Sequence, residues 1–282
     1  MKKKKDKLVA VFLLLVLGSG LTLLLYPMVS DQWNSYHQTK AIAQYKEAVD
    51  GLGEEEYEKM WEEAEFYNAA LSAQGNKAAS GKEQKEEYEK MLNVGKLGVM
   101  CYIEIPGIKC TLPVYHGTEE SVLQIAAGHV EWSSLPIGGE SSHCVISGHR
   151  GLPSARLFSD LDQMEEGDFF RIHVLNEVLT YEVDQILIVE PQETAALQIV
   201  EGKDYCTLVT CTPYGINTHR LLVRGHRISG NEEITNIHVT ADAVLIRPYL
   251  VIITVAIPVM LLILIFLLLP QHAKNGGEGN EK

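Results

Sequence analysis

A cysteine and an arginine lie nine residues apart in a stretch of the sequence that is otherwise rich in strand-forming side chains. Cys211 ends a run of β-branched and apolar residues, 205–211, and Arg220 opens a second apolar run. The residues between them include a proline, a glycine and an asparagine, which favour a turn. The pattern predicts an antiparallel hairpin that brings the thiol and the guanidinium side by side.

Placed side by side, these two groups can carry out nucleophilic catalysis. A thiolate is the nucleophilic form of cysteine, and a nearby cation stabilises it. The planar guanidinium of Arg220 can also hold an oxyanion as it develops on an attacked carbonyl. A buried cysteine in a strand, next to an unrelated surface arginine, fits the same residues equally well.

Such a nucleophile needs a proton carrier, for which histidine is the commonest side chain. His149 follows the apolar run 144–147 and precedes a loop, so it is expected at the end of a strand. His219, next to Arg220, and His143 are competing candidates by spacing alone. The residues themselves leave this choice open.

The elements that must position these groups are mostly strands. From residue 96 onward, apolar and β-branched runs alternate with turn residues, a pattern typical of a closed all-β barrel or a sandwich. The predicted strands span residues 99–105, 110–115, 144–147, 169–175, 178–189, 205–211 and 220–228.

The region before the strands has a helical pattern. Apolar residues recur at helical spacing over residues 30–71, and Gly51 and Gly53 predict a break into two helices. Residues 72–82 are small and polar and predict a flexible loop, and a short helix is expected over residues 83–92. We therefore expect residues 28–95 to form a helical stalk that carries a flexible loop.

Two long apolar runs flank these regions and predict two membrane helices. The first, residues 8–25, follows a cluster of four lysines, and the second, residues 249–269, is long enough to cross a bilayer of about 30 Å. The first run resembles the apolar region of a cleaved signal peptide, but it is longer than such a region usually is. We expect a signal-anchor over residues 1–27 and a transmembrane helix over residues 248–270. A linker (231–247) and a tail (271–282) complete the chain. Both termini are then cytoplasmic, because the lysines resist export, and the strand-rich domain lies outside.

Charge and cysteine content exclude some functions. A formal net charge of -13 argues against a nucleic-acid partner. The five cysteines form no Cys-x-x-Cys pair, and neither a metal-ligand spacing nor a glycine-rich phosphate loop is visible. The sequence therefore predicts no cofactor and no metal. We expect buried structural thiols at every cysteine except Cys211, although a disulfide such as Cys101–Cys110 remains open.

Three strings resemble a known family. Thr-Leu-Val-Thr-Cys at residues 207–211, followed by Arg220, is similar to the active-site signature of the sortases, cysteine transpeptidases of Gram-positive cell surfaces. The longer string over residues 211–225 resembles class C, the pilin-polymerising sortases. Residues 147–155, Ser-Gly-His-Arg-Gly-Leu-Pro-Ser-Ala, resemble the histidine motif of the family and favour His149 over its competitors.

The resemblance covers roughly residues 96–230 and implies an eight-stranded barrel with Cys211, His149 and Arg220 as catalytic residues. It also implies cleavage of an LPXTG-like sorting signal between Thr and Gly, with transfer of the acyl group to a lysine of a pilin subunit. The alternatives are a sortase that anchors surface proteins to a cell-wall amine and a surface cysteine peptidase. A non-catalytic adhesin fits the strand pattern but not the co-occurrence of the three motifs.

One feature of class C is missing. These sortases usually carry a lid with an Asp-Pro-aromatic triplet ahead of the barrel, and this chain has no proline between Pro27 and Pro106. The loop over residues 72–82 occupies the corresponding place and has no aromatic residue. The sequence therefore predicts an open Cys211 site.

Overall fold

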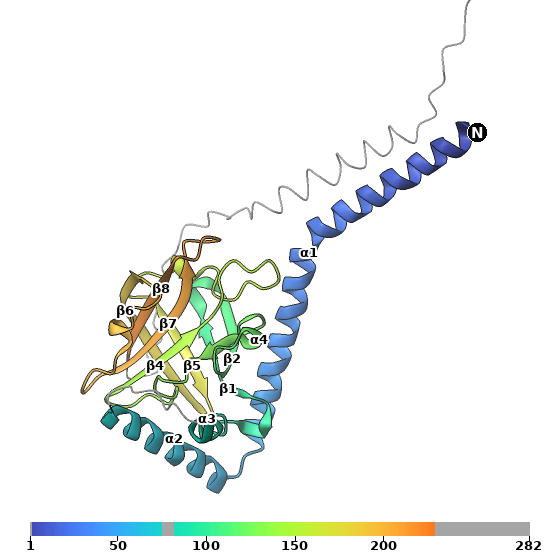
Figure 1. Ribbon diagram of the computed structural model, residues 1–282. Helices are drawn as coiled ribbons and strands as arrows, with labels where there is room; N and C mark the ends of the chain where they lie inside the picture. Colours follow the sequence, from blue (N-terminus) through green and yellow to red (C-terminus); the bar gives the residue numbers. More distant parts are fainter. Residues whose placement is uncertain (1, 75–81, 229–282) are drawn as a thin grey trace, which may run out of the picture. The chain divides into compact units, whose positions relative to one another are not determined.

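The computed structural model describes residues 2–74 and 82–228 (Figure 1). Two compact units are distinguished, and the one over residues 28–232 contains all the described strands. The loop predicted at the lid position falls largely on residues 75–81, and the second apolar run, its linker and the tail fall on residues 229–282. These predictions lie outside the described residues.

The N-terminal region is helical, as predicted. Helix α1 (Lys2–Asp50) ends and helix α2 (Glu54–Gln74) begins on either side of Gly51 and Gly53, where a break was expected. Glycine disfavours the helix interior because its backbone loses more conformational freedom on folding than that of other residues. Helix α3 (Lys82–Tyr88) is shorter than the predicted helix, and α4 (Glu120–Leu123) was not predicted.

Eight strands follow, joined by short turns and 3₁₀ helices. The seven predicted strands are present, within two residues at each end, and the eighth, β3, is only three residues long and carries no readable alternation. The strands are β1 (Val99–Ile105), β2 (Cys110–His116), β3 (Ala127–His129), β4 (Ser142–Ser147), β5 (Phe169–Val174), β6 (Glu177–Val189), β7 (Asp204–Thr212) and β8 (His219–Arg227). The 3₁₀ helices are η1 (Val94–Lys96), η2 (Pro106–Ile108), η3 (Leu161–Gln163) and η4 (Ala195–Leu197).

The strands close into a barrel in the order β1-β2-β3-β4-β7-β8-β6-β5. This confirms the closed eight-stranded barrel that the resemblance implied and rules out the sandwich. Most neighbours are antiparallel, but β4 pairs with β7 in parallel, and β2 pairs with β3 in parallel. The β4–β7 pair joins segments that are far apart in the sequence.

Alternating side chains fill the barrel. Strand β5 shows the pattern most clearly, with Phe170, Ile172 and Val174 buried and their neighbours partly exposed. Phe170 stacks on Tyr181 of β6, with ring centroids 5.6 Å apart. Burial of apolar surface at about 25 cal/mol per Å² is the main driving force for such a core.

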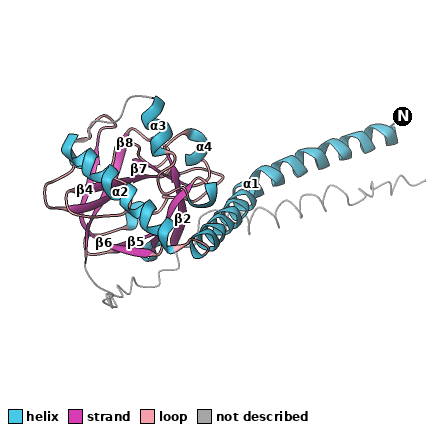
Figure 2. Ribbon diagram, turned by 90° about the horizontal axis from the view of Figure 1, so that it is seen from below, coloured by secondary structure: helices cyan, strands magenta, loops and turns pink. Residues whose placement is uncertain are grey.

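The helices pack on the barrel. The Tyr45 hydroxyl of α1 donates to the carbonyl of Met100 at 3.2 Å and accepts from the amide of Leu175 at 2.7 Å. Helix α2 crosses one end of the barrel (Figures 1 and 2), where Asn68 makes two hydrogen bonds with the backbone of Leu135. Leu135 follows the C-terminal end of β3. Because β3 runs antiparallel to β4, that end lies towards the start of β4. Helix α2 therefore covers the end of the barrel at which β4 and β7 begin.

The membrane helix expected over residues 1–27 is not borne out by the described residues. Among them, no helix combines the length and the apolar character that crossing a bilayer requires. The prediction of a span over residues 1–27 thus lacks structural support, and the predicted span over residues 248–270 lies outside the described part.

The five cysteines are free thiols, which answers the open disulfide question for this structure. Cys101, Cys144 and Cys206 are buried, and burial raises the pKa of the Cys101 thiol well above its usual value. Cys110 is only half-buried, so three of the four predicted structural thiols lie in the core.

Candidate active site

Cys211 and Arg220 face each other across the β7–β8 hairpin, as the sequence predicted. They are paired in the antiparallel ladder, and both are half-buried. The connecting loop is held by its own backbone, because the amides of Ile216 and Asn217 both donate to the carbonyl of Pro213 at 3.0 Å. The thiol and the guanidinium therefore emerge from neighbouring strands at the same rim of the barrel.

The Arg220 guanidinium is held by backbone carbonyls. Its Nη1 donates to the carbonyl of His219 at 3.1 Å and to that of Asn217 at 3.4 Å. Asn217 has a φ of 62°, in the left-handed region that asparagine tolerates better than most residues. The hairpin loop thus fixes the direction from which the guanidinium approaches the rim.

His149 reaches this rim through the parallel pairing of β4 with β7. The register pairs Ser147 with Val209, and the Gly148 amide continues it by donating to the Val209 carbonyl at 3.0 Å. The Thr210 hydroxyl donates to the Gly148 carbonyl at 2.7 Å. Continued for two residues beyond the last pair, this register places His149 opposite Cys211. No hydrogen bond joins their side chains in this structure, although catalytic hydrogen bonds are often long before substrate binds.

A carboxylate that sequence reasoning missed accompanies His149. Nε2 of the ring lies 3.4 Å from Oε2 of Glu120, in helix α4. A hydrogen bond from Gln124, followed by the contact with His149, lowers the pKa of the Glu120 carboxyl. A carboxylate beside an imidazole can orient the ring, which is the part that the third member of a catalytic triad plays. No local pattern in the sequence singled it out.

Arg150 ties the two loops of the site together. Its Nη1 donates to the Thr212 hydroxyl at 3.4 Å, it forms an ion pair with Asp162, and it lies 5.7 Å from the centroid of the Tyr214 ring. Its side chain is only 9% exposed. Residues 150 and 212 immediately follow His149 and Cys211, so this contact continues the β4–β7 register into the loops. Sequence reasoning noted Arg150 only as part of a motif.

The two competing histidines have different surroundings. His143 is buried, with its ring nitrogens 2.9 Å from the Gln198 carbonyl and 2.7 Å from the Thr207 hydroxyl, so it has a structural place in the barrel wall. His219 is exposed on the hairpin, where its Nδ1 lies 2.9 Å from the Thr218 hydroxyl. His219 pairs with Thr212, so strand pairing alone does not exclude it; of the three candidates, His149 is the one whose ring contacts a carboxylate.

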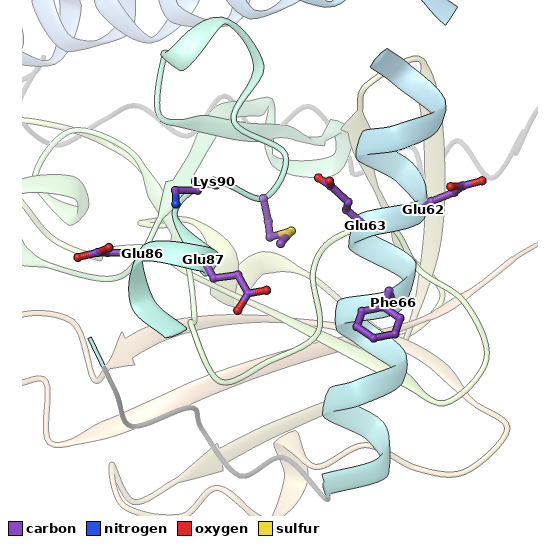
Figure 3. A pocket seen from close by; sticks show the side chains of 7 residues that line it. Glu62, Glu63, Phe66, Glu86, Glu87 and Lys90 are labelled. Atoms are coloured by element: carbon purple, nitrogen blue, oxygen red, sulfur yellow. The ribbon is translucent and has the colours of Figure 1, made fainter. Parts of the chain in front are cut away.

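A large open groove on the described surface is not at this rim. It lies between α2 and α3, has a volume of about 800 Å³, and brings together acidic side chains around an exposed phenylalanine (Figure 3). None of the three candidate catalytic residues lines it; its lining residues are Glu62, Glu63, Phe66, Glu86, Glu87, Lys90 and Met91. The motif residues and their register identify the site, because a large open groove by itself carries no chemistry.

No metal centre is evident in the described part of the chain, where no group of three or more His, Cys, Asp or Glu side chains is arranged to hold an ion. The sequence-based prediction that the protein uses no cofactor stays a prediction.

Comparison with known proteins identifies the family. Residues 103–228 match the family model described as the sortase domain. The crystal structure of sortase C1 from Streptococcus agalactiae is 52% identical, with a TM-score of 0.66, and the match covers 68% of this chain and all of that one. The chain belongs to the sortase family.

Other sortases show the same relationship. The sortase C structure from Streptococcus pneumoniae is 47% identical with a TM-score of 0.61, covering 68% of this chain and 97% of that one. Among curated proteins, sortase D of Bacillus subtilis is 30% identical over 45% of this chain, and the match spans 63% of the length of that relative. These findings confirm the resemblance to class C sortases and the predicted enzyme class, a cysteine transpeptidase.

Proposed function

We propose that this sortase cleaves an LPXTG-like sorting signal between Thr and Gly and transfers the acyl group to an amine, with Cys211 as the nucleophile. One observation carries the proposal. The motif residues Cys211, Arg220 and His149 come from three neighbouring segments, β7, β8 and the end of β4, and converge on one rim of the barrel.

The first half of the reaction forms a thioacyl-enzyme. The thiolate of Cys211 attacks the threonine carbonyl, and the guanidinium of Arg220 stabilises the negative charge that develops on the carbonyl oxygen. The C–N bond then breaks, and His149 donates a proton to the departing glycine amine. Glu120 keeps the imidazole directed towards the rim.

The second half resolves the intermediate. An acceptor amine gives a proton to His149 and attacks the thioacyl carbonyl; a new C–N bond forms and the C–S bond breaks, releasing the thiolate of Cys211. A peptidase would follow the same path with water in place of the amine. Whether the enzyme acts as a transpeptidase or a peptidase depends on how well the rim binds the acceptor amine.

The acceptor we favour is a lysine of a pilin subunit. Support comes from the class C relatives at 40–52% identity, among them the Streptococcus pneumoniae sortase C, whose structure was described in terms of pilin substrate specificity. The sortase A relatives are 27–31% identical, so anchoring of surface proteins to a cell-wall amine is the second candidate.

The test uses an LPXTG peptide with three acceptors: water alone, a pilin-type lysine peptide and a cell-wall peptide amine. We expect an isopeptide product with the lysine peptide. Cys211→Ala should give no covalent acyl-enzyme by intact mass, while Cys110→Ala, which removes the other half-buried thiol, should react normally. An acyl-enzyme on Cys211→Ala would refute the assignment of the nucleophile, and hydrolysis alone would favour the peptidase.

We further propose that the enzyme is attached to a membrane, with the barrel outside and both termini in the cytoplasm. The apolar run over residues 8–25 and the lysines before it support this attachment, as do the exposed apolar side chains of α1, among them Phe12 and Leu15. Protease added to protoplasts should remove the barrel and spare tags at both ends. Recovery of the full-length chain in the soluble fraction would contradict the attachment.

A further inference from the structure

Helix α1 has its polar and apolar faces reversed where it first meets the barrel. The side chains that face the barrel there are polar. Asn34 donates to the carbonyl of Ser154 at 2.8 Å, Asp31 accepts from the amide of Arg156 at 2.8 Å, and Gln38 donates to the carbonyl of Ile125 at 2.7 Å.

The opposite face is apolar and aromatic and faces away from the barrel. Val29 is 64% exposed, Trp33 66% and Tyr36 63%. At 3.6 residues per turn these three side chains fall within an arc of about 60°, and the three polar contacts occupy a similar arc on the other side of the helix. We call these three residues the aromatic stripe.

Two turns further along, the same helix has the ordinary arrangement. Ile42, Tyr45 and Val49 are buried against the barrel, on the face that carried the polar contacts upstream. A helix on a soluble domain normally buries its apolar face throughout. The reversal is therefore confined to the segment before residue 40, and it leaves a contiguous apolar surface without a partner in the described structure.

The chemistry of the stripe points to a bilayer surface. Tryptophan and tyrosine combine a large apolar ring with a polar tip, and they are enriched at both membrane–water interfaces. In the sequence, the apolar run that ends at Leu25 stands four residues before Val29. A stripe of this composition, directly after such a run, is suited to the level of the lipid headgroups.

We propose that Val29, Trp33 and Tyr36 insert into the membrane–water interface and thereby hold the rim of the active site beside the bilayer. The polar face of the same segment is hydrogen-bonded to the backbone of residues 154 and 156, in the loop that follows His149. The helix therefore connects the membrane–water interface to this loop directly. This inference rests on the proposed membrane attachment but not on the proposed reaction.

The experiment measures the fluorescence of Trp33 in the full-length protein reconstituted into phosphatidylcholine–phosphatidylglycerol vesicles. Trp61→Phe and Trp132→Phe together leave Trp33 as the only tryptophan, and a matched protein keeps only Trp61, on α2. Lipids brominated near the headgroup end of the acyl chain should quench the Trp33 emission and leave that of Trp61 unchanged, because bromine quenches only at short range and interfacial tryptophans lie at the headgroup level.

Two further variants test the stripe itself. Val29→Ser with Tyr36→Ser, in the protein that keeps Trp33, should reduce the quenching and shift the emission to the red. Val178→Ser with Ile188→Ser, which removes exposed apolar side chains from β6, should change neither. Equal quenching in both double variants would overturn the role of the stripe.

The remaining outcomes are also decisive. Absence of bromolipid quenching at Trp33 overturns the proposal. If Trp33 becomes protected only when a sorting-signal protein is added, the stripe is a protein-docking surface and the lipid assignment is wrong. The fluorescence does not depend on turnover, so an inactive enzyme with a quenched Trp33 would contradict the proposed reaction and leave this inference intact.

Discussion

Arg150 donates a hydrogen bond to the hydroxyl of Thr212 at 3.4 Å, joining the residue after His149 to the residue after Cys211. The same guanidinium pairs with Asp162 and lies near the ring of Tyr214. Gly151 lies against that ring, since a Cβ placed on it would be 3.2 Å from Tyr214 Cε2. A single, largely buried cation thus links the two loops that carry the proposed base and nucleophile.

We expect Arg150→Lys to reduce kcat by about 10²-fold, because a displacement of about 1 Å between reacting groups costs that much. Lysine keeps the charge, but it lacks the planar fork with which arginine contacts Asp162 and Thr212 at the same time. The KM for an LPXTG peptide should change little. Arg156→Lys, in the same loop and paired with Asp160, is the matched control and should keep its activity. A kcat near that of the wild type in Arg150→Lys would show that the contact is incidental.

Arg220→Lys should lower kcat/KM by about 10²–10³-fold, the usual effect of losing an oxyanion-stabilising donor. A lysine ammonium retains the charge but not the fork that the carbonyls of Asn217 and His219 hold in place. Steady-state transfer of an LPXTG peptide measures the effect, and Arg227→Lys, at the far end of β8, serves as the control. Turnover close to that of the wild type would mean that Arg220 acts only as a point charge.

Gly148→Ala should reduce both stability and activity. A Cβ at this position would lie 2.6 Å from Cδ2 of the buried Phe158, and overpacking of this kind costs about 1–3 kcal/mol. If the backbone moved to relieve this clash, His149, the next residue, would shift with it. The Tm and kcat should fall together, while Gly20→Ala, in α1, which meets no atom within 4 Å, should lower neither. An unaltered Tm would show that Phe158 moves aside freely.

His143 should make the barrel acid-sensitive. Burial lowers the pKa of its ring, and the nearby Arg224 lowers it further, against opposing contributions from the Gln198 carbonyl and Asp184. The unfolded chain then binds the proton more readily than the folded chain, so this contribution to stability is complete above about pH 6.5 and is lost as the pH falls.

Urea unfolding between pH 7 and 5 measures this dependence. His143→Gln should reduce the slope of the unfolding free energy against pH by up to about 1.4 kcal/mol per pH unit. His219→Gln, at an exposed position, is the control and should keep the slope of the wild type. An unchanged slope in His143→Gln would assign the acid sensitivity, if any, to other groups.

The sequence by itself determined the elements whose signals are local. The turn residues between Cys211 and Arg220 predicted their hairpin because a short loop fixes the register of the strands that it joins. Alternating burial in strands such as β5 and the break at Gly51 were readable for the same reason. The three motif residues were found by likeness to the sortases, since composition and spacing alone left His149, His143 and His219 as rivals.

Tertiary structure decided what depends on pairing between distant segments. The parallel contact of β4 with β7 joins residues such as Gly148 and Thr210, 62 positions apart, and no local pattern specifies such a pair. That contact sets His149 level with Cys211, buries His143 in the barrel wall and brings Arg150 to Thr212. Glu120 and the outward-facing Trp33 became visible only when their helices were placed against the barrel, because the direction of a side chain follows from packing and not from sequence spacing.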